Sequence, residues 1–322
     1  MPKERIIWLD NLKVFLILMV VLGHTLLFTN HEGTGNLPYR IISSFWMPLF
    51  MFTSGFSSYR VEQGWDVVKK RFFQLMIPFL SWSVVVCAIQ GTYHLEKMFL
   101  YPTESMWFLY ALFFIILIHV LTCKVAKRVG IKEELLVLIV AAVLWGAQRA
   151  TRCHFFATDL ISYHFVFYSL GFYFRKYYDH TMRLSPVWFY LLGFGFIVMA
   201  FFHHESYYEM MQLPSSLHII YDFICAFLSL APFVYVFSRW ADVRSRMSII
   251  GGGTLGIYVF HLAIYKFLQF RIMGDLYLDT TSTIFYYLLA LFIWQAIFWL
   301  SYSLTFICRK NHLLSLLLLG SK

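Results

Sequence analysis

Long runs of apolar residues alternate with short polar stretches along the whole chain. Most of these runs approach the ~20 residues that a helix needs to cross the hydrocarbon core of a bilayer. The pattern therefore predicts an all-α polytopic membrane protein with about ten transmembrane helices, at residues 7–28, 40–59, 74–92, 106–122, 133–148, 160–174, 186–203, 216–237, 254–271 and 283–307. The fifth and sixth runs are short, and a split or merger there would change the number of spans but not the class.

The composition supports the same class. Hydrophobic residues make up 60% of the 322 residues and charged residues only 13%, whereas soluble domains carry about 25% charged residues. No separate soluble domain, low-complexity tract or internal repeat is evident. We therefore expect one transmembrane domain over residues 1–322.

Basic residues are distributed unevenly between the predicted loops. If the N-terminus is cytoplasmic, nineteen of the 26 Lys and Arg residues lie in cytoplasmic segments and five in outer segments. Because Lys and Arg accumulate in cytoplasmic loops, both ends of the chain are predicted to be cytoplasmic. The net charge of +9 follows from this bias and requires no nucleic acid, although anionic membrane lipids or an anionic cytosolic ligand could add to it.

The first apolar run does not have the pattern of a cleaved signal peptide. Asp10 and Lys13 stand where the apolar core of such a peptide would begin, and no small-residue cleavage site follows, so we expect the helix to be retained. The cysteines lack metal-type spacing and predict neither a disulfide nor a metal site. They are Cys87, Cys123, Cys153, Cys225 and Cys308.

Two ionisable side chains, Lys13 and His24, lie inside this first run. Ionisable groups inside a membrane span are costly and mark candidate functional sites. Eleven residues at about 100° each make three turns plus about 20°, which places both groups on one helix face about 16 Å apart. They are expected to line one cavity, in which a neutral His24 would act as a general base. Alternatively, Lys13 pairs with Asp10 one turn away, and His24 only makes a hydrogen bond between helices.

Three further patches hold candidate residues. Ser54 and Gly55 form a small-residue pair that permits close helix packing. Three cations at residues 69–71 suit a cytoplasmic loop and would also bind a phosphate-bearing ligand. Trp107 opens the fourth predicted span, where an interfacial aromatic belt is the alternative to a binding role.

A fourth patch starts at Gly251 and ends at His261. Three glycines before a predicted helix let the backbone approach a ligand, and free amides at the helix start favour an anion. A simple turn between spans explains the glycines equally well. Tyr258 and His261 are one helical turn apart and face the same way. The Lys-Ser/Thr end of a phosphate loop is absent, so nucleotide hydrolysis is not predicted.

In this order, the motifs resemble those of the integral membrane type-3 acyltransferases, and most closely the fucose 4-O-acetylase-like acetyltransferases. The resemblance extends from residue 5 to about residue 270 and rests on residues 8–13 with His24, 52–56, Arg71 before Pro78, 107–109 and 256–261. A basic residue followed by ten positions and a His is the family signature, which Lys13 and His24 match. Lys13 keeps the charge of the usual Arg but not its bidentate geometry. A family pair of arginines aligns with Arg71 and Gln74, so its second member is missing here.

The resemblance implies an enzyme that moves an acyl group, usually acetyl, from cytosolic acetyl-CoA to a hydroxyl group. The acceptor would be a sugar, a cell-envelope glycan or a lipid-linked saccharide, and the location a bacterial inner membrane. His24 would act as base in a direct transfer or form an acyl-enzyme, and Tyr258 or His261 would stabilise the oxyanion or orient the donor. No metal is implied. The donor would contact Asp10, Lys13, Ser54, Arg71 and Trp107.

A proton-coupled secondary transporter of a small polar solute is the alternative. It would also place His and Lys side chains inside membrane spans. Such a transporter is expected to show two matching halves with broken helices, and the sequence has no such symmetry that we can identify.

Overall fold

The computed structural model describes residues 6–30, 35–60, 64–92, 94–183, 185–203, 215–242, 250–273, 278 and 282–321. All regular structure within these ranges is helical, as the apolar pattern predicts. Contacts between residues divide the chain into two compact units. The first comprises Met1–Phe50 and Asp179–Leu304, and the second Met51–Tyr178 and Thr305–Lys322.

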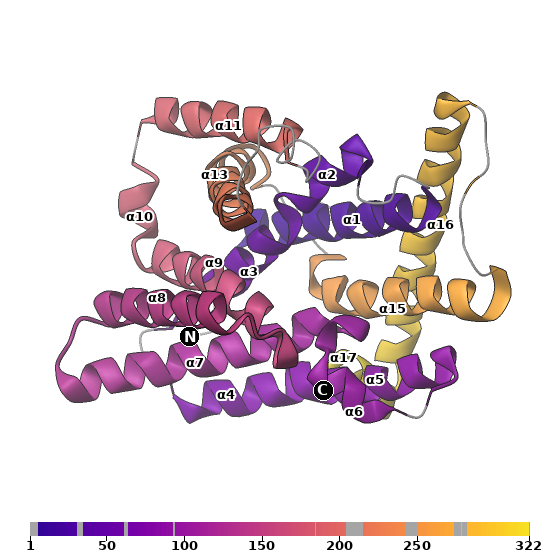
Figure 1. Ribbon diagram of the computed structural model, residues 1–322, viewed down its shortest axis with the longest axis horizontal. Coiled ribbons are helices and arrows are strands. Elements are labelled where there is room, and N and C mark those ends of the chain that lie inside the picture. The colour runs from indigo at the N-terminus through magenta and orange to yellow at the C-terminus, as the bar shows by residue number, and fades with distance from the viewer. Residues whose placement is uncertain are drawn as a thin grey trace. The chain divides into compact units, whose positions relative to one another are not determined.

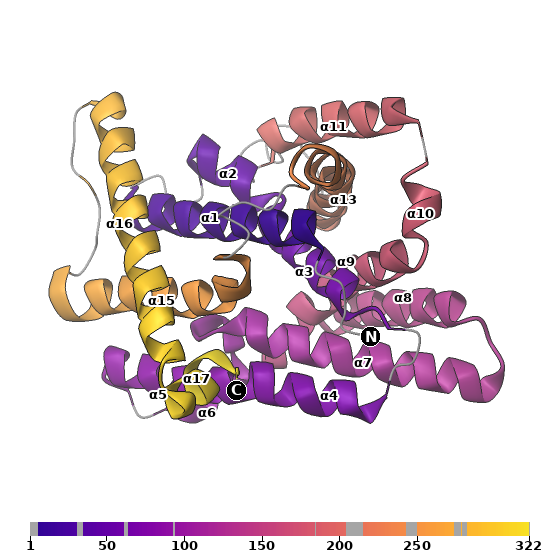
Figure 2. The same ribbon diagram turned by 180° about the vertical axis from the view of Figure 1, so that it is seen from behind.

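The helices are distributed between the units as follows, with labels as in Figures 1 and 2. The first unit contains α1 (Ile7–Thr29), α2 (Leu37–Ser43), α11 (Pro186–Phe201), α13 (Ser215–Trp240), η5 (Gly251–Gly253), α15 (Thr254–Phe267) and η6 (Leu268–Met273). The second contains α4 (Trp65–Arg71), η2 (Phe72–Met76), α5 (Ile77–Gln90), α6 (Leu95–Leu100), η3 (Pro102–Glu104), α7 (Trp107–Val129), α8 (Glu133–Thr151), η4 (Phe155–Ala157), α9 (Thr158–Lys176) and α17 (His312–Leu319). The unit boundaries fall within α3 (Trp46–Ser58), α10 (Tyr178–Thr181) and α16 (Thr283–Arg309).

Six of the described helices are long and apolar enough to cross a membrane, so the chain is a multi-pass membrane protein. They are Ile7–Thr29, Trp65–Gln90, Trp107–Val129, Glu133–Thr151, Leu217–Trp240 and Thr283–Arg309. The other four predicted spans coincide with helices that do not meet this criterion: α2 with α3 and α15 with η6 are divided, α11 is short, and α9 has 19 residues but is not among the six. Ten spans and two cytoplasmic ends therefore stay predictions.

The division of the predicted span 40–59 has a physical cause. A proline has no N–H and its ring clashes with the carbonyl four residues earlier. Pro48 stands in the first turn of α3, four residues after Ser44, so α2 cannot continue through it without losing that bond. Two helices with a turn between them result, where the apolar pattern alone predicts one.

In the first unit, α1 is held along its length by buried packing and by hydrogen bonds to other segments of the chain. Its Leu12, Leu16 and Val21 side chains have no exposed surface. At its start, the backbone N–H of Trp8 donates to Asp242 Oδ1 (3.1 Å). Farther along, Trp294 Nε1 of α16 donates to a main-chain carbonyl of α1 (3.1 Å). Figures 1 and 2 both show α15 beside α1, so two sets of candidate residues lie on neighbouring helices.

In the second unit, glycines bring α3 and α9 into backbone contact. A methyl group built on Gly55 would overlap the Tyr168 carbonyl, and one built on Gly171 would overlap the Phe52 carbonyl. Each helix therefore places a glycine against the main chain of the other. Gly55 of the predicted small-residue pair therefore permits close packing of α3 and α9.

Candidate functional site

Two histidines from α1 and α15 meet inside the first unit. His261 Nε2 lies 3.4 Å from His24 Nδ1, and the ring centroids are 5.1 Å apart. Each Nδ1 also lies 2.9 Å from a main-chain carbonyl oxygen of its own helix, that of Val20 for His24 and that of Ile257 for His261. His261 is fully buried and His24 partly buried.

These carbonyl contacts define the tautomer of each imidazole. A carbonyl oxygen only accepts hydrogen bonds, so Nδ1 must carry the hydrogen in both rings, and Nε2 of a neutral ring keeps its lone pair. The Nδ1–H of His24 thus donates a bifurcated hydrogen bond, to the Val20 carbonyl and, at the longer distance, to Nε2 of His261. Within the described part of the chain, Nε2 of His24 has no hydrogen-bond partner. It is therefore the nitrogen available to take a proton.

Aromatic rings hold His24 in this orientation. The Trp46 ring stacks on the imidazole at 5.2 Å between centroids, and a Cβ added at Gly23 would overlap that tryptophan. Tyr265 donates to Thr25 Oγ1 (2.5 Å), because the threonine hydroxyl itself donates to a helix carbonyl. Stacking on Trp46 and the hydrogen bond from Tyr265 thus hold this part of α1 in place against the neighbouring helices.

The start of α1 places Asp10 beside the glycine run. A Cβ on Gly251 would lie 3.0 Å from the Cβ of Asp10 and 3.1 Å from its carbonyl oxygen, so η5 packs closely on α1. Lys13 and His24 belong to one continuous helix, which confirms the basis of the predicted common face. Both side chains are partly buried. Farther along α15, the Tyr258 ring lies 5.9 Å from that of His261, as their spacing predicts.

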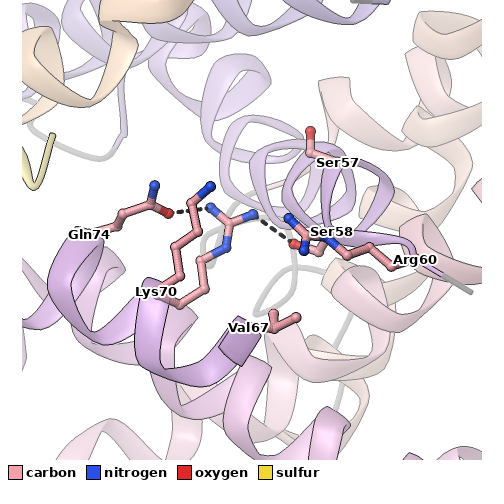
Figure 3. Close-up of a pocket in the computed structure, with 7 residues that line it drawn as sticks. Ser57, Ser58, Arg60, Val67, Lys70 and Gln74 are labelled. Carbon is pink, nitrogen blue, oxygen red and sulfur yellow. Dashed lines mark hydrogen bonds between the residues drawn. The ribbon is translucent and has the colours of Figure 1, made fainter. Parts of the chain in front are cut away.

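A polar cavity of about 80 Å³ in the second unit is lined by Arg71 and by the six residues that Figure 3 labels. Arg71 donates from Nη1 to Gln74 Oε1 (3.0 Å) and from Nη2 to Ser58 Oγ (3.2 Å). The lining includes three cations and no carboxylate. It consists of Ser57, Ser58, Arg60, Val67, Lys70, Arg71 and Gln74. Such a lining suits a phosphate-sized anion.

The remaining predicted donor residues of this unit lie outside that lining. Ser54 is partly buried on α3, one turn before Ser58. Trp107, at the start of α7, stacks on the buried His164 with ring centroids 5.6 Å apart. Asp10, Lys13, His24, Tyr258 and His261 belong to the first unit, and Ser54, Arg71 and Trp107 to the second.

Two partnerships were not predicted from the sequence. Ser58 holds Arg71 from another helix, 13 positions away in the chain, and no local pattern indicates it. Contact between His24 and His261 joins residues 237 positions apart. For this part of the site, the sequence indicated Gln74 only as the position that aligns with the second arginine of the family pair.

Comparison with known proteins places these features in a family. The family described as an acyltransferase domain, type 3, matches residues 6–300. A curated relative, "Nodulation protein NolL" of Mesorhizobium japonicum (strain LMG 29417 / CECT 9101 / MAFF 303099), is 28% identical over 200 residues. The aligned part covers 54% of this chain and 49% of the relative, so the chain spans about half the length of that protein. No solved structure matches. The family match covers most of the chain and includes His24, Arg71 and His261. The chain therefore belongs to the type-3 membrane acyltransferases.

Proposed function

We propose that this acyltransferase is an acetyl-CoA-dependent O-acetyltransferase that modifies a hydroxyl group of a sugar, in a cell-envelope glycan or a lipid-linked saccharide. The observation that carries the proposal is the orientation of His24. Its Nδ1–H is committed to a main-chain carbonyl and to His261, and its Nε2 lone pair is left available. A general base needs that arrangement.

His24 then takes part in a direct transfer. Its Nε2 removes the proton of the acceptor hydroxyl as the oxygen attacks the thioester carbonyl carbon. An ester C–O bond forms, the C–S bond breaks, and the departing thiolate of CoA receives the proton from His24. Because the imidazole is positively charged between these two proton transfers, the carbonyl of Val20 and the Nε2 of His261 stabilise it through Nδ1–H.

The donor is assigned to acetyl-CoA because the second unit has a suitable anion site. CoA is polyanionic at one end, and the Arg71 cavity presents three cations without a carboxylate. Gln74 and Ser58 hold two edges of the guanidinium, which leaves its remaining N–H groups for a phosphate. We assign Ser54 and Trp107 to the donor as well, on the resemblance alone.

Three residues of the first unit complete the proposal. Lys13 contributes positive charge on the cytosolic side of α1, and Asp10 orients this end of the helix through its packing on Gly251. Tyr258 supports the ring of His261. The glycan acceptor and a bacterial inner membrane rest on the resemblance to the fucose 4-O-acetylase-like acetyltransferases.

Purified protein in nanodiscs tests the proposal directly. The protein is mixed with acetyl-CoA and a panel of sugars and lipid-linked saccharides, and both free CoA and acetylated product are followed. Wild type is expected to form both in equal amounts. His24→Ala should lose about 10²-fold to 10⁴-fold in rate, the usual contribution of a general base. The matched control is His180→Ala, which removes an exposed histidine.

The outcome that refutes the proposal is equally definite. If wild type and His24→Ala release CoA at the same rate with every acceptor, His24 is not the base. If proteoliposomes instead accumulate a sugar in response to a proton gradient, the transporter alternative replaces the enzyme.

A further inference from the structure

The helix that carries Arg71 changes its winding directly after that residue. Between α4 and α5, the segment η2 (Phe72–Met76) forms a π turn, in which the N–H of Ile77 donates to the carbonyl of Phe72, five residues earlier. Such turns are rare and frequently occur at functional sites. This one contains Gln74, the hydrogen-bond partner of Arg71 in the polar cavity.

Pro78 explains why the helix widens there. A proline cannot donate to the carbonyl four residues earlier, and its ring clashes with that group. The carbonyl four residues before Pro78 is that of Gln74. A wider turn relieves the clash, and because Pro78 has no N–H, the Gln74 carbonyl lacks the usual i+4 donor.

Another helix covers this widened turn. Gly320, the residue that ends α17, packs on the main chain of Gln74: an added Cβ would lie 2.6 Å from the Gln74 Cα and carbonyl carbon and closer still to its oxygen. Gly320 also has a positive φ of 60°, which favours glycine. Both the contact and the backbone conformation therefore select glycine at this position.

Further bonds hold α17 in this place. Trp82 Nε1 of α5 donates to the carbonyl of Leu318 (3.0 Å). Asn311 caps the start of α17 by accepting from the N–H of Leu313 (2.9 Å). Ser315 and Ser321 are joined through their hydroxyls (2.8 Å) across the end of the helix. Figures 1 and 2 show α17 beside α5, and the helix lies beyond residue 300, where the family match ends.

We infer that α17 is a clasp that keeps the π turn in the form that presents Arg71 and Gln74 to the donor phosphates. Gly320 and Trp82 are its positioning residues. The inference rests on the proposed use of acetyl-CoA and adds an element outside the family match. Since the clasp acts on the phosphate cavity, loosening it should weaken donors that carry phosphates and leave phosphate-free donors unaffected.

Gly320→Ala tests the clasp, with Gly130→Ala as its matched control. Gly130 also ends a helix with positive φ, 76°, but has no neighbour within 4 Å of an added Cβ. Rates are measured in nanodiscs with acetyl-CoA and with S-acetylpantetheine, a thioester donor without phosphates. For Gly320→Ala, KM for acetyl-CoA should rise about tenfold, or ~1.4 kcal/mol, with KM for S-acetylpantetheine and kcat unchanged. Gly130→Ala should alter neither KM.

A second variant decides the matter if Gly320→Ala does not fold. Trp82→Phe removes the bond to Leu318 and keeps an aromatic ring, and its expected effect is a smaller rise in KM for acetyl-CoA alone. Its control is Trp299→Phe, which removes an exposed indole bond to Gln295.

Two results would overturn the clasp. Gly320→Ala and Trp82→Phe could each match their controls, or KM could rise equally for both donors, which indicates general loosening. If wild type transfers an acetyl group from neither donor, the proposed function itself is disproved. That result comes from wild type alone, so it is distinguishable from a failure of the clasp.

Discussion

Replacing His261 with Phe separates the two histidines by role. His261 is fully buried, and its ring lies 5.9 Å from Tyr258 and 6.4 Å from Tyr265. A phenyl ring preserves this packing but has no nitrogen to accept the Nδ1–H of His24. The bond from that N–H to the carbonyl of Val20 remains.

The expected loss follows from the length and charge of the bond that disappears. At 3.4 Å between nitrogens, the bond in the neutral pair is weak, about 0.5 kcal/mol. When His24 holds the substrate proton, the same bond is charge-assisted and is worth about 2 kcal/mol. The difference of about 1.5 kcal/mol stabilises only the transition state, so losing it in His261→Phe should lower kcat about tenfold. KM for the donor should stay constant, since the ground state loses little.

Initial rates over a range of acetyl-CoA concentrations measure both parameters. His261→Gln places an acceptor near the position of Nε2 and should restore most of the rate. His119→Phe, the same exchange at another buried histidine, is the control for repacking. The reasoning is refuted if His261→Phe keeps the wild-type kcat, or if it falls as far as His24→Ala, because His261 would then be the base itself.

Three other substitutions have clear expected outcomes. CoA should raise the melting temperature of Arg71→Ala less than that of wild type, whereas the rise that pantetheine produces should be unchanged. If CoA raises the melting temperature equally in both proteins, Arg71 is not part of the donor site. Gly55→Ala should lower the melting temperature because its methyl group overlaps a carbonyl of α9. The control, Gly146→Ala, has open space around the added methyl group and should not lower it. Identical unfolding curves for the two variants would contradict the close packing. Tyr265→Phe removes the hydrogen bond to Thr25 and should cost about 1 kcal/mol of stability in a denaturant titration, and no loss would mean that the bond contributes nothing.

The apolar pattern predicted where most helices lie, because the formation of a membrane-spanning helix depends on the local sequence. The first apolar run, at 7–28, corresponds to α1 at Ile7–Thr29, and the tenth, at 283–307, to α16 at Thr283–Arg309. Hydropathy does not reveal where a helix divides. Pro48 separates α2 from α3 within one apolar run, and the helix of the third run begins at Trp65, before its apolar part.

The candidate site was predictable to the same extent. Residues on one helix, such as Lys13 with His24 or Tyr258 with His261, could be paired from spacing, because a helix fixes the angle between them. Contacts between helices could not, since α1 and α15 are far apart in sequence. The sequence therefore indicated His24 as a base but not that another histidine accepts the hydrogen of its Nδ1.

The departure from the family at Gln74 now has a structural explanation. The family pattern places a second arginine at this position, but the cavity already holds Arg60, Lys70 and Arg71. A fourth cation would repel the other three, and it could not accept a hydrogen bond from Arg71, since guanidinium groups only donate. Gln74 accepts that bond at 3.0 Å and leaves the number of cations at three. Gln74 thus fixes the direction in which Arg71 presents its charge to the cavity.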